Sequence, residues 1–275
     1  MAARRKLGRI ALYLVLSVMV LIVLFPYYWM IVCSVRPEVE IYSSRPTLIP
    51  GSLSLVNYQK VMGSKIPRYL LNSFLISGGA MLLCLAVSIP AAYALARFQF
   101  RGKNAVTSGV LLFKLLPQSA TLIPLYIMLV NTKLFDTRFG LSFVNLFIMV
   151  PYTIWVARGF IKTVPFSVEE AAMIDGCNRI QAIIRVIVPI ISAGLFSVAL
   201  YAFMLSWEEF LYSSTFTVKD AKTVTVGLAS LIGEDASDWG AILAGSVLMG
   251  APIIILFCCL QNSFIKGMVG GAVKG

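Results

Sequence analysis

The sequence predicts an all-α, polytopic membrane protein with six transmembrane helices. Of its 275 residues, 59% are apolar or aromatic and only 13% are charged, whereas about 25% of the residues of an average soluble domain are charged. The apolar residues gather in several runs of about 20 residues, the length that a helix needs to cross ~30 Å of hydrocarbon. A soluble globular fold and a disordered chain are therefore both disfavoured.

The expected spans follow the apolar runs along the chain. Basic residues precede the first run, as in a signal peptide, but the run exceeds the 7–15 residues of a signal peptide's apolar region and predicts a transmembrane helix instead. Pro117 and Pro124 lie in the third run and predict a kinked or broken helix there. We expect the spans at residues 10–35, 69–96, 105–130, 141–157, 190–212 and 241–265, within a single transmembrane domain over residues 1–275.

The charges predict the orientation of the chain. The net charge is +11, which the Lys and Arg excess of cytoplasmic loops explains without nucleic acid. The Lys and Arg residues concentrate on the cytoplasmic side of the membrane when both termini are placed there. This orientation puts the loop 36–69 outside and the loop 158–189 inside. The chain has no His, and its five cysteines have no metal-ligand spacing and suggest no disulfide framework.

The long inner loop contains two helix-compatible stretches, Val168–Cys177 and Asn178–Ile187, joined around Gly176. We expect Ser167 to cap the first stretch, because Glu170 follows at the spacing of a capping box. Gly176 supplies the backbone freedom for the turn between them.

The order of residues in this loop matches a known motif. Glu170-Ala171-Ala172, three residues, Gly176, nine residues, then Val186-Ile187-Val188-Pro189 resembles the EAA motif of ABC-importer permeases. Val186 and Val188 stand where the family usually has Ile and Leu. Tyr93-Ala94-Leu95-Ala96-Arg97 is similar to the family's preceding inner loop, so the resemblance extends well beyond the motif.

The resemblance implies the type I ABC-importer permease fold and the transport of a sugar, oligosaccharide or related polyol, as by the second permease of maltose-type transporters. It makes 167–189 the coupling (EAA) loop, hereafter the coupling loop. The ATPase-coupling residues that it implies are Glu170, Ala171, Ala172, Asp175, Gly176 and Pro189.

The implied partners are a second homologous permease, two ATPase subunits and an extracellular or periplasmic substrate-binding protein. The chain contains no Gly-x-x-x-x-Gly-Lys-Ser/Thr phosphate loop, so it is expected to be no enzyme and to bind no cofactor. ATP and Mg are then held by the ATPase subunits. The expected location is a bacterial or archaeal plasma (inner) membrane, in contact with lipid.

Charged residues inside the spans are candidates for a substrate path. A charge at the centre of a span costs about 2.5–3.5 kcal/mol on insertion scales, so Lys114, Glu208 and Glu209 are expected to face water or a partner. Trp207 offers a ring for a pyranose face, and we expect Glu208 to face the solute and Glu209 to be structural. The alternatives are an ion pair between Lys114 and a glutamate, or charged side chains that extend to the membrane interface.

Aromatic residues give weaker candidates. Tyr126 and Tyr152, with Trp155 and Tyr201, fit a cavity lining as well as packing or an interfacial belt.

Two other functions remain open from the sequence. A secondary transporter could couple ions through Glu208, Glu209 and Lys114. A membrane-embedded enzyme is disfavoured by the missing His and the missing catalytic motifs. The inner element could also be a hairpin that only lies on the bilayer, although its charges are mixed rather than basic. Basic residues outside, at Lys60, Lys65 and Arg68, leave an anionic saccharide possible.

Overall fold

The structure, a computed structural model, describes residues 2–233 and 237–272, and this part of the chain is helical with no strand. The predicted cytoplasmic ends Met1 and 273–275 lie outside the described residues. The chain forms two compact units. The first contains residues 1–67 and 227–252, and the second contains residues 68–226 and 253–275.

The first unit contains the N-terminal helix and the segment that follows it. Helix α1 (Ala2–Ser34) is apolar over Gly8–Ser34, and none of its most apolar window is buried. Two short helices follow, α2 (Glu38–Ile41) and α3 (Val56–Gly63), with turns between them. Helix α14 (Trp239–Ala272) begins in this unit and ends in the second.

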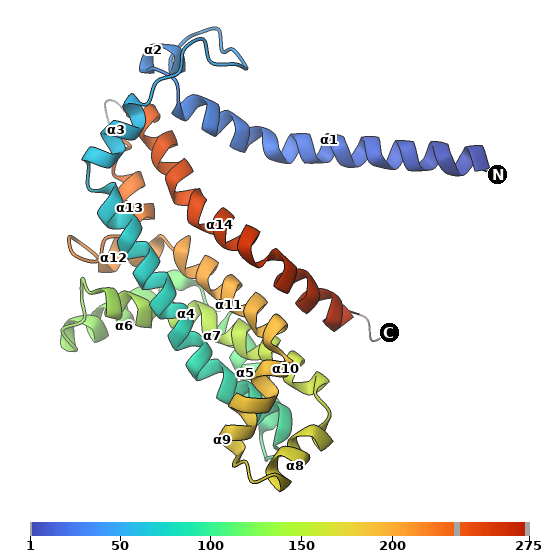
Figure 1. The fold of residues 1–275 in the computed structure, drawn as a ribbon. Coiled ribbons are helices and arrows are strands. Elements are labelled where there is room, and N and C mark those ends of the chain that lie inside the picture. Colours follow the sequence, from blue (N-terminus) through green and yellow to red (C-terminus); the bar gives the residue numbers. More distant parts are fainter. Residues whose placement is uncertain (1, 234–236, 273–275) are drawn as a thin grey trace. The chain divides into compact units, whose positions relative to one another are not determined.

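The second unit contains the remaining helices. They are α4 (Ile66–Arg97), α5 (Lys103–Phe113), α6 (Gln118–Asn131), α7 (Arg138–Thr163), α8 (Phe166–Ile174), α9 (Arg179–Ala182), the π-helical turn η1 (Ile183–Ile187), α10 (Val188–Ile190), α11 (Ser192–Trp207), α12 (Leu211–Phe216) and α13 (Val224–Ala229), which reaches into the first unit. Helices α8 and α9 lie at one end of this unit, and α6 and α12 lie toward the other (Figure 1).

The described helices account for six spans when each bent pair counts as one. Four single helices are long and apolar enough to cross a membrane, and two pairs bend at short breaks, α5 with α6 by 95° and Arg179–Ile190 with α11 by 88°. The break predicted in the third span is present, and it ends at Pro117, the N-cap of α6. The fifth span differs from its predicted end at residue 212, because α11 stops at Trp207 and α12 is a separate helix.

The core of the second unit lies where α7 packs against α11 and α4. Fully buried alanines at 80, 92, 157 and 202 let these helices approach closely, as small residues do in membrane bundles. Gly194 of α11 is another position of close approach, because a Cβ there would lie 2.6 Å from the ring of Phe160. The core thus fixes α4, α7 and α11 as one packed body.

The end of the second unit opposite α8 is fastened by polar contacts. The Asp136 carboxylate, between α6 and α7, accepts four backbone N–H bonds from Val218–Ala221 at 3.0–3.1 Å. Partial burial alone would raise the pKa of Asp136, but these four donors outweigh it and hold the pKa below its ordinary value. Asn72 of α4 joins the cluster by donating to the carbonyls of Asp220 and Lys222 at 2.9 Å.

We predict that Asp136→Asn lowers the free energy of unfolding by about 1–3 kcal/mol, because an amide presents only one acceptor oxygen to these N–H groups. Thermal unfolding in detergent measures the change, with Asp220→Asn as the control, since Asp220 forms one exposed ion pair worth less than about 1 kcal/mol. The lowered pKa means that the native contribution is complete at neutral pH. It should be lost only below about pH 3.9, the ordinary pKa of Asp. Equal melting temperatures for the two variants would contradict this role.

Candidate functional site

The coupling loop begins differently from the prediction. Helix α8 starts at Phe166 after the N-cap residue Pro165, and no side chain caps it. The predicted cap at Ser167 is therefore wrong, because Pro165 already sets the start of the helix and places Ser167 inside its first turn. A capping box does occur at α9, where Asn178 and Gln181 each accept a bond from the other's backbone N–H at 2.9 Å.

Gly176 forms the turn between the two helices of the coupling loop. Its φ is +89°, in the left-handed region that favours glycine. The backbone closes α8 around it: Gly176 N–H donates to the Met173 carbonyl at 3.2 Å, and Cys177 N–H donates to the Ala172 carbonyl at 3.0 Å. A Cβ at Gly176 would meet nothing within 4 Å. The requirement for glycine is therefore one of backbone conformation, not of space.

The coupling loop has one exposed face. Glu170, Ala171 and Asp175 are exposed, and no ion pair or side-chain hydrogen bond of the two acidic residues occurs within the described chain. Ala172 is buried and anchors the opposite side of α8. Pro189, the last motif residue, lies in the short helix α10 and is exposed. Glu170, Ala171 and Asp175 therefore offer small and acidic groups for a partner.

The buried face of α8 holds a residue that the sequence interpretation missed. Glu169 is 1% exposed, accepts a hydrogen bond from the Tyr93 hydroxyl through Oε1, and has Oε2 2.9 Å from Arg97 Nε. These two atoms face each other as an ion pair without the alignment of a hydrogen bond. The motif drew attention to Glu170 next to it. The available signal was Tyr93 and Arg97, whose i, i+4 spacing places both on one face of α4.

A cavity of about 500 Å³ lies within the second unit, where α5, α6, α7, α11 and α12 meet. Its polar or ionisable lining residues are Lys114, Gln118, Thr121, Tyr201, Glu208, Glu209 and Tyr212. Three charged candidates predicted from the sequence therefore come together at one cavity. Glu208 and Lys114 are both exposed in it, so their charges are open to a solute.

Lys114 does not pair with either glutamate in the described structure. Its Nζ lies 4.8 Å from the ring centroid of Tyr152, and Tyr152 contacts Tyr201 with ring centroids 4.4 Å apart. A cation over an aromatic face is attracted by the ring quadrupole. The tyrosine pair thus positions Lys114 beside the cavity and leaves its hydrogen-bond donors unused by an ion pair.

Of the aromatic candidates, Tyr201 lines the cavity, whereas Trp207, Tyr126, Tyr152 and Trp155 do not. Trp207 is 1% exposed, stacks on Phe203 with ring centroids 5.6 Å apart, and does not line the cavity. In this structure core packing covers the ring, so neither of its faces is accessible to the pyranose expected there from the sequence. Tyr126 packs edge-on against Phe135 and also lies outside the lining.

Glu209 caps a helix from inside the break between α11 and α12. It is 6% exposed, and its carboxylate accepts bonds from Tyr212 N–H at 2.6 Å, Ser213 N–H at 2.9 Å and the Ser213 hydroxyl at 2.9 Å. Its carbonyl oxygen also accepts from Thr225 at 3.1 Å. These contacts favour the structural role expected for Glu209, and Glu208 remains as the accessible carboxylate.

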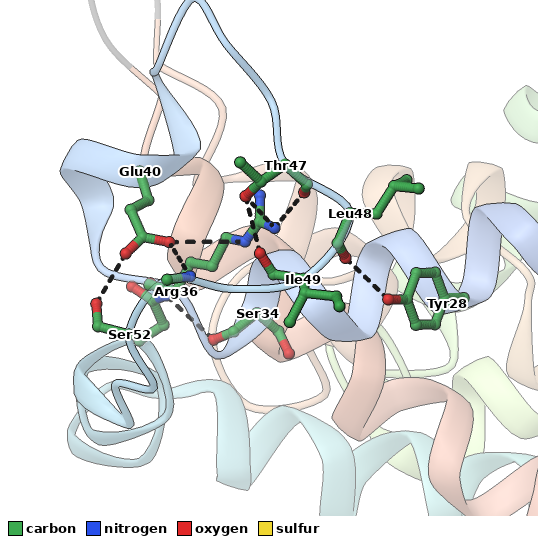
Figure 2. Close-up of polar contacts among 10 residues, drawn as sticks. Tyr28, Ser34, Arg36, Glu40, Thr47, Leu48, Ile49 and Ser52 are labelled. Atoms are coloured by element: carbon green, nitrogen blue, oxygen red, sulfur yellow. Dashed lines mark hydrogen bonds and ion pairs between the residues drawn. The ribbon is translucent and has the colours of Figure 1, made fainter.

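The predicted outer loop of the first unit is organised around a buried cation. Arg36 is 2% exposed, donates to the Thr47 carbonyl and hydroxyl, and lies 3.9 Å from Glu40 (Figure 2). Glu40 also accepts a hydrogen bond from the Ser52 hydroxyl at 2.8 Å. This bond is the main reason that the pKa of the Glu40 carboxyl lies below its ordinary value. Tyr28 closes the loop by donating to the Leu48 carbonyl at 2.8 Å. The loop is therefore internally hydrogen-bonded.

Most basic residues proposed for the outer surface are already paired. Lys60 lies 2.9 Å from Asp238 and 3.4 Å from Glu38 in the first unit, and Arg68 lies 3.0 Å from Asp220 in the second. The bond to Asp238 raises the pKa of Lys60 above its ordinary value. The described residues contain no cluster of His, Cys, Asp or Glu that could hold a metal ion.

Known proteins resemble this chain over almost its whole length. It is 30% identical to the diacetylchitobiose uptake system permease protein DasC of Streptomyces coelicolor, over 99% of each chain. It is 32% identical to the trehalose/maltose transport system permease protein MalG of Thermococcus litoralis, over 98% of each. The fold matches a chain in the crystal structure of a bacterial ABC transporter that imports the acidic polysaccharide alginate, with a TM-score of 0.80, 21% identity, and coverage of 94% of this chain and 97% of that one.

The family match includes the coupling loop and the cavity. Residues 85–269 match the family described as the binding-protein-dependent transport system inner membrane component. The matched region contains the Gly176 turn, the buried Glu169 contact, and every residue that lines the cavity. The chain therefore belongs to the family of binding-protein-dependent transport system inner membrane components.

Proposed function

We propose that this chain is one of two permease subunits of an ATP-driven importer for a neutral saccharide or polyol. The observation that supports it most is the exposed face of the coupling loop. Glu170 and Asp175 are exposed there, and the left-handed Gly176 follows them and ends the helix. Two full-length relatives are named for diacetylchitobiose and for trehalose and maltose. Their names favour a carbohydrate.

The coupling loop is the proposed contact with the motor. Carboxylates at Glu170 and Asp175 can form charge-assisted hydrogen bonds with Arg or Lys of an ATPase subunit. Ala171 lets the partner backbone approach closely beside them. In this assignment two ATPase subunits hold ATP and Mg and perform hydrolysis, and this chain binds no cofactor. The loop is then cytoplasmic, as are both termini.

The cavity is the proposed part of the solute path. Lys114, Gln118, Thr121 and Glu208 present donors and acceptors that match hydroxyl groups, and Tyr201 adds an aromatic surface. A second permease subunit completes the path across the membrane, and an extracellular or periplasmic binding protein delivers the solute. ATP binding would open the path outward through the coupling loop, and hydrolysis would return it to the inward-open state.

A neutral solute fits the charges better than an anionic one. Lys60 and Arg68, which could have attracted an anion, are paired with Asp238 and Asp220. At the cavity, the positive charge of Lys114 is matched by that of the exposed carboxylate Glu208. The cavity therefore presents no excess of positive charge that would concentrate an anion.

The test is solute uptake by the assembled complex in proteoliposomes, with ATP enclosed beside the ATPase subunits and the loaded binding protein on the other side. We expect uptake of labelled neutral oligosaccharides that needs both ATP and the binding protein and persists when ionophores collapse ion gradients. Uptake driven by an ion gradient without ATP would instead support a secondary transporter. Faster uptake of uronate oligomers than of neutral ones would contradict the proposed solute class.

We predict that Lys114→Met and Glu208→Gln each raise the apparent KM for uptake about tenfold. A charge-assisted hydrogen bond contributes about 1.5–3 kcal/mol, and a tenfold loss of affinity corresponds to about 1.4 kcal/mol. Initial uptake rates over a range of solute concentrations measure the change. Lys133→Met, which removes an exposed charge outside the cavity, is the matched control. An unchanged KM in both cavity variants would remove this cavity from the solute path.

A further inference from the structure

The cytoplasmic end of α4, as proposed above, is fastened to the coupling loop by a buried polar joint. Glu169 of α8 contacts two residues of α4, Tyr93 through its hydroxyl and Arg97 through its guanidinium. Glu169 is 1% exposed and Tyr93 is 4% exposed. The joint therefore connects two elements that are about 70 residues apart in the sequence, in an environment from which water is largely excluded.

Arg97 binds the start of α8 at three points. Beside the Glu169 contact, its Nη2 donates to the Val164 carbonyl at 2.9 Å, and its Cζ lies 5.6 Å from the ring centroid of Phe166. The three contacts differ in direction and in kind. Sliding of α8 along α4 would break all of them together, so they fix the position of the segment from Val164 to Glu169.

Two further contacts extend this attachment to both sides of α8. Arg158, near the end of α7, donates to the Leu95 carbonyl of α4 at 3.2 Å. Arg179, at the start of α9, lies with its Cζ 4.8 Å from the ring centroid of Phe98, just beyond α4. The end of α4 thus contacts the coupling loop before and after the Gly176 turn.

The buried ion pair between Glu169 and Arg97 suits a role in aligning the two segments as well as in stabilising them. A buried ion pair is often no more stabilising than well-packed apolar residues of similar volume, but loss of one partner leaves a costly unpaired charge. Apolar packing between these segments is already present, in the core that contains Leu95, Ile161 and Val164. The hydrogen bond and the ion pair depend on direction, so they fix the alignment of α8 on α4, which apolar contacts alone do not.

We infer that the Tyr93–Glu169–Arg97 joint makes α4 move with the coupling loop when the ATPase subunits act on it. Helices α7 and α11 flank the coupling loop and are connected to it through the chain itself. Helix α4 contacts the coupling loop only noncovalently. Glu169 and Arg97 are then positioning residues that add a third helix to the moving body. The inference rests on the proposed ATP-driven function.

Distances between spin labels test this in the assembled complex. Nitroxides are placed at Phe100 and Ile174, both exposed, and a second pair at Ile123 of α6 and Ile174, in a chain whose cysteines have been replaced. We expect ATP to leave the 100–174 distance within about 2 Å of its nucleotide-free value. The 123–174 distance should change by more than that.

The result that overturns the inference is a change in both distances, because α4 would then separate from the moving loop. No change in the 123–174 distance, together with no cross-linking between position 170 and an ATPase subunit, would overturn the proposed function as well. The two failures are thus distinguishable, and neither measurement requires a destabilised variant.

Variants give a second readout. Glu169→Gln should make the 100–174 distance depend on nucleotide and lower the number of solute molecules imported per ATP hydrolysed about tenfold. The double variant R97Q/E169Q should lose no more than the worse single variant, since both substitutions break one joint. Arg101→Gln, which removes an exposed positive charge from the segment between α4 and α5, is the control. A role in folding alone would lower the yield of complex but leave the solute-to-ATP ratio of the assembled complex unchanged, and that result would overturn the inference.

Discussion

Gly176→Val should abolish most ATP-coupled uptake while the transmembrane helices remain folded. A β-branched residue at φ +89° is strained whatever the space around it, and such strain costs about 1–3 kcal/mol. The turn can relieve the strain only by redirecting α9 relative to α8, which changes the face offered to the motor. We expect uptake to fall at least tenfold in proteoliposomes, with a melting temperature close to that of the native chain.

Two controls separate strain from position. Gly159→Val adds the same side chain at an exposed helical glycine with open space and no positive φ, so it should keep coupled uptake. Gly102→Val adds similar strain at φ +84°, but outside the coupling loop. It should cost stability locally and leave the solute-to-ATP ratio unchanged. If Gly176→Val kept native uptake and native ATPase stimulation, the coupling assignment would be wrong.

Glu209→Ala should destabilise the second unit by about 3 kcal/mol or more. The substitution removes the acceptors of two buried backbone N–H groups and of the Ser213 hydroxyl, and unpaired buried donors cost about 1–3 kcal/mol each. Helix α12 loses its cap, and its residues Tyr212 and Phe216 are part of the core. Thermal unfolding and the yield of assembled complex measure the effect.

The neighbouring glutamate is the matched control. Glu208→Ala removes an exposed carboxylate for which no hydrogen bond or ion pair occurs in the described chain. We therefore expect its melting temperature to stay near that of the native chain, while its KM for uptake rises. Equal destabilisation by the two substitutions would show that Glu209 does not act through its bonds to α12.

The long helices could be predicted because their signal is composition. Runs of apolar residues identified α1, α4, α7 and α14 to within a few residues in most cases. The end of α11 could not be found in this way, because Phe210, Leu211 and Tyr212 continue the apolar run beyond Trp207. What ends the helix is a tertiary arrangement in which Glu209 turns its carboxylate onto the next turn of chain. The pattern of apolar residues does not predict that contact.

The turn at Gly176 was predictable, because the glycine lies between two helix-compatible stretches of sequence. The coupling role of Glu170 and Pro189 rests on the resemblance to the EAA motif and stays a prediction. The roles of Trp207 and Glu169 depend on which way each side chain faces, and on what α4 and α7 place beside it. Trp207 points into the core and Glu169 onto α4. Neither direction follows from residue type, because an aromatic ring or a carboxylate is equally compatible with a cavity and with a packed interior.

The π-helical turn η1 has a consequence for insertions and deletions. A π turn holds more residues than an α turn, so it acts as a one-residue insertion within an otherwise α-helical path. It lies between α9 and the proline-containing α10. Deleting one residue from Ile183–Ile187 would restore α-helical winding and rotate α8 and α9 by about 100° around the helix axis relative to α11. The direction in which the exposed acidic face points is thus set by the number of residues between Gly176 and Pro189, independently of which residues fill the interval.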